Sequence, residues 1–220
     1  MLRHALTLLL ALNTAALAAG NDDLDIDKVN GSIHVPDNAT AGKLSTVNGG
    51  IRIGAGAHAK SVETVNGGID VGASATVDSL ETVNGGLRVS EKVRVAKTVE
   101  TVNGSITLDN DVDVAGKLSN VNGGIRLDNA HVGGGIETVS GDIDVGANSR
   151  VEGGILVEAD HSWFRIGSGR LPRIVIGPHA AVQGTLTFKR DVELYVSDSA
   201  TIGAVQGAKP VKFSGDKPPQ

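Results

Sequence analysis

Aliphatic and polar residues follow one another along most of this chain in a pattern that repeats every 18 or 19 residues. The clearest marker is a five-residue phrase, V-N-G-G-I or a close variant, which occurs seven times between residues 29 and 143. A short fixed period is typical of a solenoid, in which each repeat buries its apolar face only by stacking on its neighbours. The pattern therefore predicts an elongated repeat protein.

Each repeat contains three groups of aliphatic positions, which we interpret as three short strands. The first group has two apolar positions separated by one outward residue, as at Ile51 and Ile53, which is the alternation of a strand with one buried face. The second and third groups follow within the same repeat, as at Ala59 and Val62. Three such walls predict an all-β, single-domain parallel β-helix (β-solenoid) of roughly triangular section, with its handedness undetermined. Seven or eight coils stacked at about 4.8 Å would form a rod of about 35–40 Å.

The Asn-Gly step of each phrase is predicted to mark a corner of the coil. Asparagine and glycine adopt the left-handed backbone region more readily than other residues, so a sharp bend can recur there. The expected turn glycines are Gly31, Gly49, Gly67, Gly85, Gly104, Gly123 and Gly141. The asparagines before six of them should stack as an amide ladder, formed by Asn30, Asn48, Asn66, Asn84, Asn103 and Asn122. Ser140 takes this place in the seventh copy and indicates that the regular stack ends there.

An antiparallel roll of hairpins would use the same residues. Asn-Gly between alternating apolar residues is also the strongest short signal for a β-hairpin. We favour the parallel solenoid because three aliphatic walls repeat in step with a single corner. Antiparallel neighbours, or Ile51 and Ile69 facing water, would contradict this interpretation.

Outward positions of the first wall alternate in charge. Arg52, Asp70 and Arg88 occupy equivalent places in consecutive repeats, so adjacent coils should pair them. An exposed pair of this kind contributes at most about 1 kcal/mol. A column of threonines beside the corner is expected to pack as a hydroxyl ladder; it comprises Thr46, Thr64, Thr82, Thr101 and Thr138.

A second outward column is acidic. Glu63, Glu81 and Glu100 fall in three consecutive repeats, and Glu137 lies two repeats further on. Stacked glutamates repel one another and need relief from lysines such as Lys60 and Lys97, from ions or from a partner. The column is therefore either a solvated edge or an acidic binding stripe.

Composition limits the function further. Aromatic residues make up only 2% of the chain, so a thin interior must be built from Val, Ile, Leu and Ala. A net charge of −5 offers no basic surface for nucleic acid, and the absence of cysteine excludes disulfides. The coils are too short to hold a catalytic cleft, and the histidines fall on different columns. We expect no enzyme activity, no cofactor and no catalytic or metal-binding residue.

The N-terminal segment, residues 1–18, has the pattern of an export signal. A short cationic start at residues 1–4 precedes an apolar run at residues 5–12 and a small-x-small cleavage motif at residues 16–18. The apolar run is too short to span a bilayer comfortably. We expect a cleaved signal peptide (1–18), no transmembrane segment in the mature protein, and a periplasmic, cell-surface or secreted location.

The pattern divides the remaining chain into three parts. Residues 19–157 should form the regular solenoid, residues 158–207 irregular C-terminal coils and a cap, and residues 208–220 a disordered tail. All five aromatic residues lie after position 160. Four of them are expected to form a C-terminal cap or contact surface: Trp163, Phe164, Phe188 and Tyr195. This end could either be closed or serve as a junction between copies.

The phrase E-T-V-N-G-G-I at residues 63–69, with its variant at residues 81–87, resembles the repeats of a bacterial adhesin family with β-strand repeats of unknown function. The likeness covers roughly residues 24–157 and implies an exported β-solenoid. Residues 174–203 are also similar to bactofilins, which are polymer-forming parallel β-helices that join end to end. An export signal departs from the usual cytoplasmic setting of bactofilins.

We therefore expect a non-enzymatic, exported structural or adhesive β-solenoid of the bacterial cell envelope. It would bind an unidentified envelope or surface component through its sheet faces, or associate with itself end to end. The alternative is a carbohydrate-binding or carbohydrate-acting β-helix protein, with a cleft lined by Asp160, His161 and Trp163.

Overall fold

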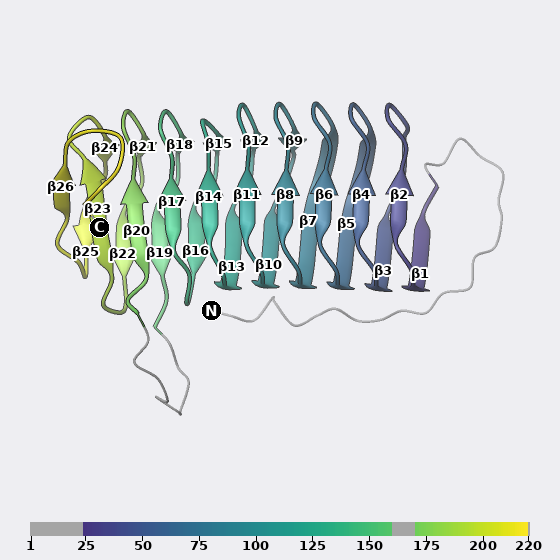
Figure 1. The fold of residues 1–220 in the computed structure, drawn as a ribbon, viewed down its shortest axis with the longest axis horizontal. Helices are drawn as coiled ribbons and strands as arrows, with labels where there is room; N and C mark the ends of the chain where they lie inside the picture. Colours follow the sequence, from purple (N-terminus) through teal and green to yellow (C-terminus); the bar gives the residue numbers. More distant parts are fainter. Residues whose placement is uncertain (1–23, 160–169, 220) are drawn as a thin grey trace.

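The computed structural model describes residues 24–159 and 170–219, which form a rod of stacked β-coils (Figure 1). The predicted signal peptide at residues 1–18 lies outside the described residues. Successive coils follow one another along the long axis, from β1 at one end to β26 at the other. The described part of the chain consists of strands and turns, and it offers no helix that could cross a membrane.

The strands form two hydrogen-bonded sheets, which run the length of the rod. The ten-stranded sheet contains the first strand of each coil: β2 (Ile33–Val35), β4 (Ile51–Ile53), β6 (Ile69–Val71), β8 (Leu87–Val89), β11 (Ile106–Leu108), β14 (Ile125–Leu127), β17 (Ile143–Val145), β20 (Arg173–Ile176), β23 (Glu193–Ser197) and β26 (Val211–Phe213). Nine spacings of about 4.8 Å between these ten strands make the rod about 43 Å long.

The sixteen-stranded sheet contains the second and third strands of the coils. The second strands are β9 (Arg94–Val95), β12 (Asp113–Val114), β15 (His131–Val132), β18 (Arg150–Val151), β21 (Ala181–Val182) and β24 (Thr201–Ile202). The third strands are β1 (Ile26–Asn30), β3 (Leu44–Asn48), β10 (Val99–Asn103), β13 (Leu118–Asn122), β16 (Ile136–Thr138), β19 (Ile155–Val157), β22 (Leu186–Phe188) and β25 (Val205–Gln206). β5 (His58–Asn66) and β7 (Thr76–Asn84) each combine the second and third strands of a coil in one continuous strand, which joins both sets into one sheet.

Neighbouring coils are parallel, which confirms the predicted solenoid and excludes the hairpin alternative. Between β4 and β6, Ile51 lies opposite Ile69 and Ile53 lies opposite Val71. Ile51 and Ile69 are 1% and 0% exposed, so both face the interior. Each coil thus buries its apolar side chains only against the coils above and below it.

The core consists of the three predicted aliphatic walls and one further column. Val77 of the second wall and Leu80 of the third are almost completely buried. The further column precedes the second wall and contains small side chains: Ala57, Ala75, Val93, Val112, Ala130, Ser149 and Ala180. These side chains lie next to the turn between the first and second strands, and each is at most 3% exposed.

The solenoid continues past its regular part, as expected. The coil between β17 and β20 is longer than those before it, because Ile143 pairs with Ile174. The segment from 208 to 220, expected to be a disordered tail, contains β26, which pairs with β23. The strand forms there because the backbone of β23 offers an open edge to which a parallel strand can bond.

Candidate functional site

Six asparagine side chains form a continuous ladder along one edge of the rod, as predicted. The amide Nδ2 of Asn48 donates to Oδ1 of Asn30 at 3.0 Å, and Asn66 donates to Asn48 at 3.0 Å. The bond recurs in the next three coils and ends with Asn122 donating to Asn103 at 2.9 Å. All five bonds point in the same direction, so the ladder fixes the register of the coils and gives this edge a uniform amide surface.

The glycines after these asparagines are needed for a reason other than the predicted left-handed bend. Of the seven predicted turn glycines, only Gly31 and Gly123 have a left-handed backbone, with φ of 106° and 129°, so the prediction is wrong for the other five. A Cβ built on Gly85 would lie well under 3.0 Å from the carbonyl oxygen of Gly67 in the preceding coil, and Gly104 has the same relation to Gly85. The coils meet backbone to backbone at this corner, where any side chain would overlap the coil before.

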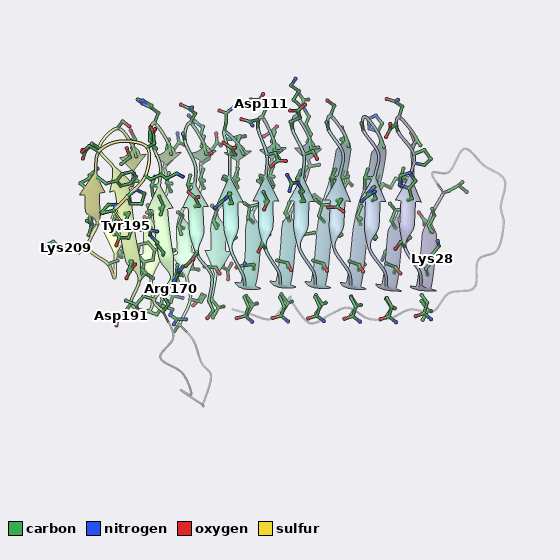
Figure 2. All side chains as sticks on the ribbon, in the orientation of Figure 1. Lys28, Asp111, Arg170, Asp191, Tyr195 and Lys209 are labelled. Carbon is green, nitrogen blue, oxygen red and sulfur yellow. The ribbon has the colours of Figure 1, made fainter. Side chains whose placement is uncertain are left out.

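The left-handed bend lies at the opposite edge, in the turn between the first and second strands of each coil. Its members have φ between 46° and 65°: Asn38, Gly56, Ser74, Lys92, Asp111, Asn129, Asn148 and His179. Asp111 marks this edge in Figure 2. Sequence analysis missed the column because its residue changes from coil to coil, and its only signal is an enrichment in asparagine, aspartate and glycine.

Beside the ladder, threonine faces inward and valine faces outward. Thr46, Thr64, Thr82, Thr101 and Thr138 are at most 4% exposed. Thr64 Oγ1 donates to the carbonyl oxygen of Gly49 at 2.8 Å, and the same bond recurs in neighbouring coils. The expected hydroxyl ladder is therefore wrong: the first four hydroxyls bond to glycine carbonyls of the preceding coil and hold the close corner in place. Thr138 donates instead to Oδ1 of Asn120.

The predicted acidic stripe lies on the outer face of the third strands. Glu63, Glu81 and Glu100 stand opposite one another in β5, β7 and β10. Lys43 Nζ lies 3.2 Å from Glu63 Oε2, which neutralises one end of the stripe. Lys97, expected to serve this column, pairs with Asp78 at 3.0 Å.

The ends and the middle of the acidic stripe differ in the ion pairs that the described residues form. Lys117 Nζ lies 3.1 Å from Glu137 Oε2 at the other end of the column, and no described ion pair includes Glu81 or Glu100. Burial, together with the carboxylates of Glu100 and Glu63, raises the pKa of Glu81 above its ordinary value. The stripe is thus polarised, with neutralised ends and a negatively charged centre.

The alternating charges on the ten-stranded sheet form pairs between coils. Arg52 lies 3.8 Å from Asp70, as predicted, and Arg126 lies 3.5 Å from Asp144. Arg88 bonds instead to Asp109 at 3.4 Å, because that carboxylate lies in the turn beside it. These pairs are exposed, so they select the register more than they stabilise the fold.

The regular structure changes where Ser140 replaces asparagine in the ladder. Arg190, from the segment after β22, donates through Nη1 to the Val139 carbonyl at 3.1 Å and to Ser140 Oγ at 3.0 Å. Arg170 forms an ion pair with Asp142. The side chains of Arg170 and Arg190, with the backbone of nearby glycines, line a surface pocket of about 300 Å³.

Phe188 and Tyr195, the two described members of the predicted aromatic cap, differ in their placement. Phe188 is 5% exposed and packs in the core of the penultimate coils. Tyr195 points outward from β23, and the Arg173 guanidinium lies 4.9 Å from its ring centre. Tyr195 is therefore a surface residue at the C-terminal end of the rod (Figure 2), because the strand alternation buries Leu194 and Val196 on either side of it. Trp163, Phe164, Asp160 and His161 lie outside the described residues.

One histidine on the outer face makes contacts that the sequence did not predict. His131 Nδ1 lies 2.6 Å from Asp113 Oδ1, and Nε2 lies 3.4 Å from Glu152 Oε1. The two carboxylates flank opposite ring nitrogens and do not converge on one point. Within the described ranges no three histidine, cysteine or acidic side chains are placed to hold a metal ion.

Comparisons with protein-family models, with curated proteins and with solved structures find no match to this chain. The fold itself is a parallel β-solenoid of about 9 turns.

Proposed function

We propose that the protein is an exported, non-enzymatic structural or adhesive module of the bacterial cell envelope. The observation that carries this proposal is the repetition of surface chemistry over six successive coils, most clearly the five successive asparagine bonds. A rigid rod with amide, acidic and aliphatic columns in register can contact a repetitive partner at many points, and several weak contacts then act together. The family resemblance of residues 24–157 and the signal-like segment at residues 1–18 support the envelope location.

Self-association end to end is one form that this role can take. Within the described ranges, β2 pairs only with β4 and β26 only with β23, so each terminal strand has an open edge. Among the described residues, three of the four exposed large apolar side chains lie in the first or last coil: Leu24 at 75%, Val29 at 51% and Val211 at 51% exposed. Open edges and exposed apolar residues are features through which parallel β-proteins add a further layer.

Cell fractionation tests the export step. The full chain and a variant lacking residues 1–18 are expressed side by side, and the proposal expects only the full chain outside the cytoplasm, shortened by about 18 residues. Co-sedimentation of the exported protein with washed envelope material then tests attachment. Recovery of both chains from the cytoplasm would overturn the export proposal, and failure to co-sediment would overturn the adhesive role.

A second candidate function is carbohydrate binding, which the pocket beside Arg170 and Arg190 favours. A glycan-binding protein would remain a monomer as its concentration rises, whereas an assembling rod would grow. Sedimentation velocity over a range of concentrations distinguishes the two functions.

A further inference from the structure

The pocket at the end of the asparagine ladder exists because the regular coil is interrupted there. In the ten-stranded sheet Ile125 pairs with Ile143, one regular repeat later in the chain, but Ile143 pairs with Ile174, well over one repeat later. The additional residues fall between β19 and β20, at the corner that six earlier coils turn through an Asn-Gly step. No Asn-Gly step follows Gly123 in the sequence, so the asparagine ladder ends beside this pocket.

The lining of the pocket is polar and close to the backbone. Gly123, Gly124 and Gly141 contribute a surface without side chains, and Ser140 and Asp142 contribute a hydroxyl and a carboxylate. Pro172 is the only described lining residue with a sizeable apolar side chain. Such a lining suits a ligand that carries many hydroxyl groups more than it suits an apolar one.

The charge of the pocket is opposite to that of the chain. The lining contains two guanidinium groups, of Arg170 and Arg190, and one carboxylate, of Asp142. Asp142 pairs with Arg170 and also accepts the backbone N–H of Arg173 at 2.8 Å. The whole chain carries a net charge of −5. An excess of guanidinium over carboxylate at this position therefore gives an acidic protein a local site that attracts anions.

The hydrogen bonds of Arg190 engage one side of its guanidinium group and leave its Nε–Nη2 edge available to a ligand. Its Nη1 donates to the Val139 carbonyl and to Ser140 Oγ, which fixes the plane of the guanidinium. Among the described residues, its Nε and Nη2 make no hydrogen bond. These two N–H groups form the edge of arginine that binds a carboxylate through two parallel hydrogen bonds.

We propose that this pocket binds the carboxylate of an acidic sugar, with the Nε–Nη2 edge of Arg190 as the main anchor. Arg170 supplies a second positive charge, and Ser140, Asp142 and the glycine backbone contact the sugar hydroxyls. This inference rests on the second candidate function and assigns its site and ligand class. It is independent of export and of attachment to the envelope.

Titration followed by NMR tests the proposal on the full chain, with glucuronate, glucose and acetate as probes. Glucuronate is expected to shift the backbone amide signals of Gly123, Gly124 and Gly141, whereas glucose is not, and acetate should bind more weakly. Arg190→Lys keeps the charge but removes the two-pronged edge, so it should weaken glucuronate binding about tenfold. Arg126→Lys makes the same exchange at an arginine outside the pocket lining and serves as the matched control.

Equal shifts with glucose and glucuronate, or no shift with either, would overturn the proposal. Acetate binding as tightly as glucuronate would overturn the sugar assignment. Equal losses in Arg190→Lys and Arg126→Lys would show that the loss does not arise in the pocket and would overturn the site. Arg170→Gln, which changes an exposed side chain, provides a second test should Arg190→Lys unfold. It is expected to weaken glucuronate binding without changing the unfolding midpoint. Failure to bind glucuronate would overturn the pocket proposal and leave the envelope proposal intact. Conversely, a protein that binds glucuronate but stays in the cytoplasm would overturn the export proposal and leave the pocket proposal intact.

Discussion

Gly85 lies directly against the carbonyl oxygen of Gly67 in the preceding coil, so closely that no Cβ fits between them. The contact repeats along the whole edge, and it determines which residue can follow each asparagine. Gly86, the next residue, has its nearest neighbour 3.5 Å from an added Cβ, which is ordinary contact. Two adjacent glycines in the same phrase are therefore under different constraints.

Gly85→Ala should destabilise the rod, whereas Gly86→Ala should not. The methyl group at position 85 must push two stacked backbones apart, which we expect to lower the free energy of unfolding by about 1–3 kcal/mol. Gly86→Ala should be neutral within about 0.5 kcal/mol, since alanine reduces the freedom of the unfolded chain and meets no overlap. Urea unfolding of both variants measures the difference. Equal effects at the two positions would contradict the close-contact explanation.

Removing an asparagine from the middle of the ladder should cost more than removing one at its end. Asn66 both donates to Asn48 and accepts from Asn84, whereas Asn30 only accepts from Asn48 among the described ladder bonds. Asn66→Ala is expected to lose about 1–3 kcal/mol and Asn30→Ala about half as much, at roughly 0.5–1.5 kcal/mol for each hydrogen bond. Thermal or urea unfolding provides the comparison. Identical losses would indicate that the ladder bonds contribute nothing beyond the local turn.

The stability of the protein should depend on the side chain at Thr64 but hardly on the side chain at its neighbour Val65, when threonine and valine are exchanged at each position. Thr64→Val leaves the half-buried Gly49 carbonyl without its side-chain donor, so we expect a loss of about 1–2 kcal/mol. Val65 is partly exposed, and Val65→Thr should change the stability by less than about 0.5 kcal/mol. The midpoint of urea unfolding distinguishes them. A larger loss for Val65→Thr would mean that the two faces of the strand are reversed.

Glu81→Gln should stabilise the protein at neutral pH and have no effect at low pH. The pKa of Glu81 is raised in the folded state, so the folded protein binds a proton more tightly than the unfolded chain does. The free energy of unfolding then falls as the pH rises from the ordinary glutamate pKa through the raised one. Glutamine removes this loss and should add about 0.2–1 kcal/mol at neutral pH.

Glu137→Gln provides the matched control, because Glu137 is paired with Lys117. It should lower the stability slightly at neutral pH, where Glu81→Gln raises it. Unfolding curves at pH 7 and below pH about 4 measure both effects. If the gain in stability for Glu81→Gln persists at the lower pH, the negative charge of Glu81 is not the cause of that gain.

The sequence was sufficient to predict the solenoid, the walls of the core and the asparagine ladder. Each of these depends on a residue type that returns at a fixed spacing, and stacking parallel coils places equal positions directly above one another. Ile51 and Ile69 are buried in register for this reason, and Asn48 bonds to Asn30 for the same reason.

Other features depend on distances between segments that the sequence does not contain. The reason for glycine at position 85 is the approach of another coil's backbone, and Arg190 reaches Ser140 across 50 residues. The left-handed turn at Asp111 has no fixed residue type, because several side chains tolerate that conformation. A repeated local preference therefore determined the architecture, whereas the close corner and the pocket were decided by how the coils pack in three dimensions.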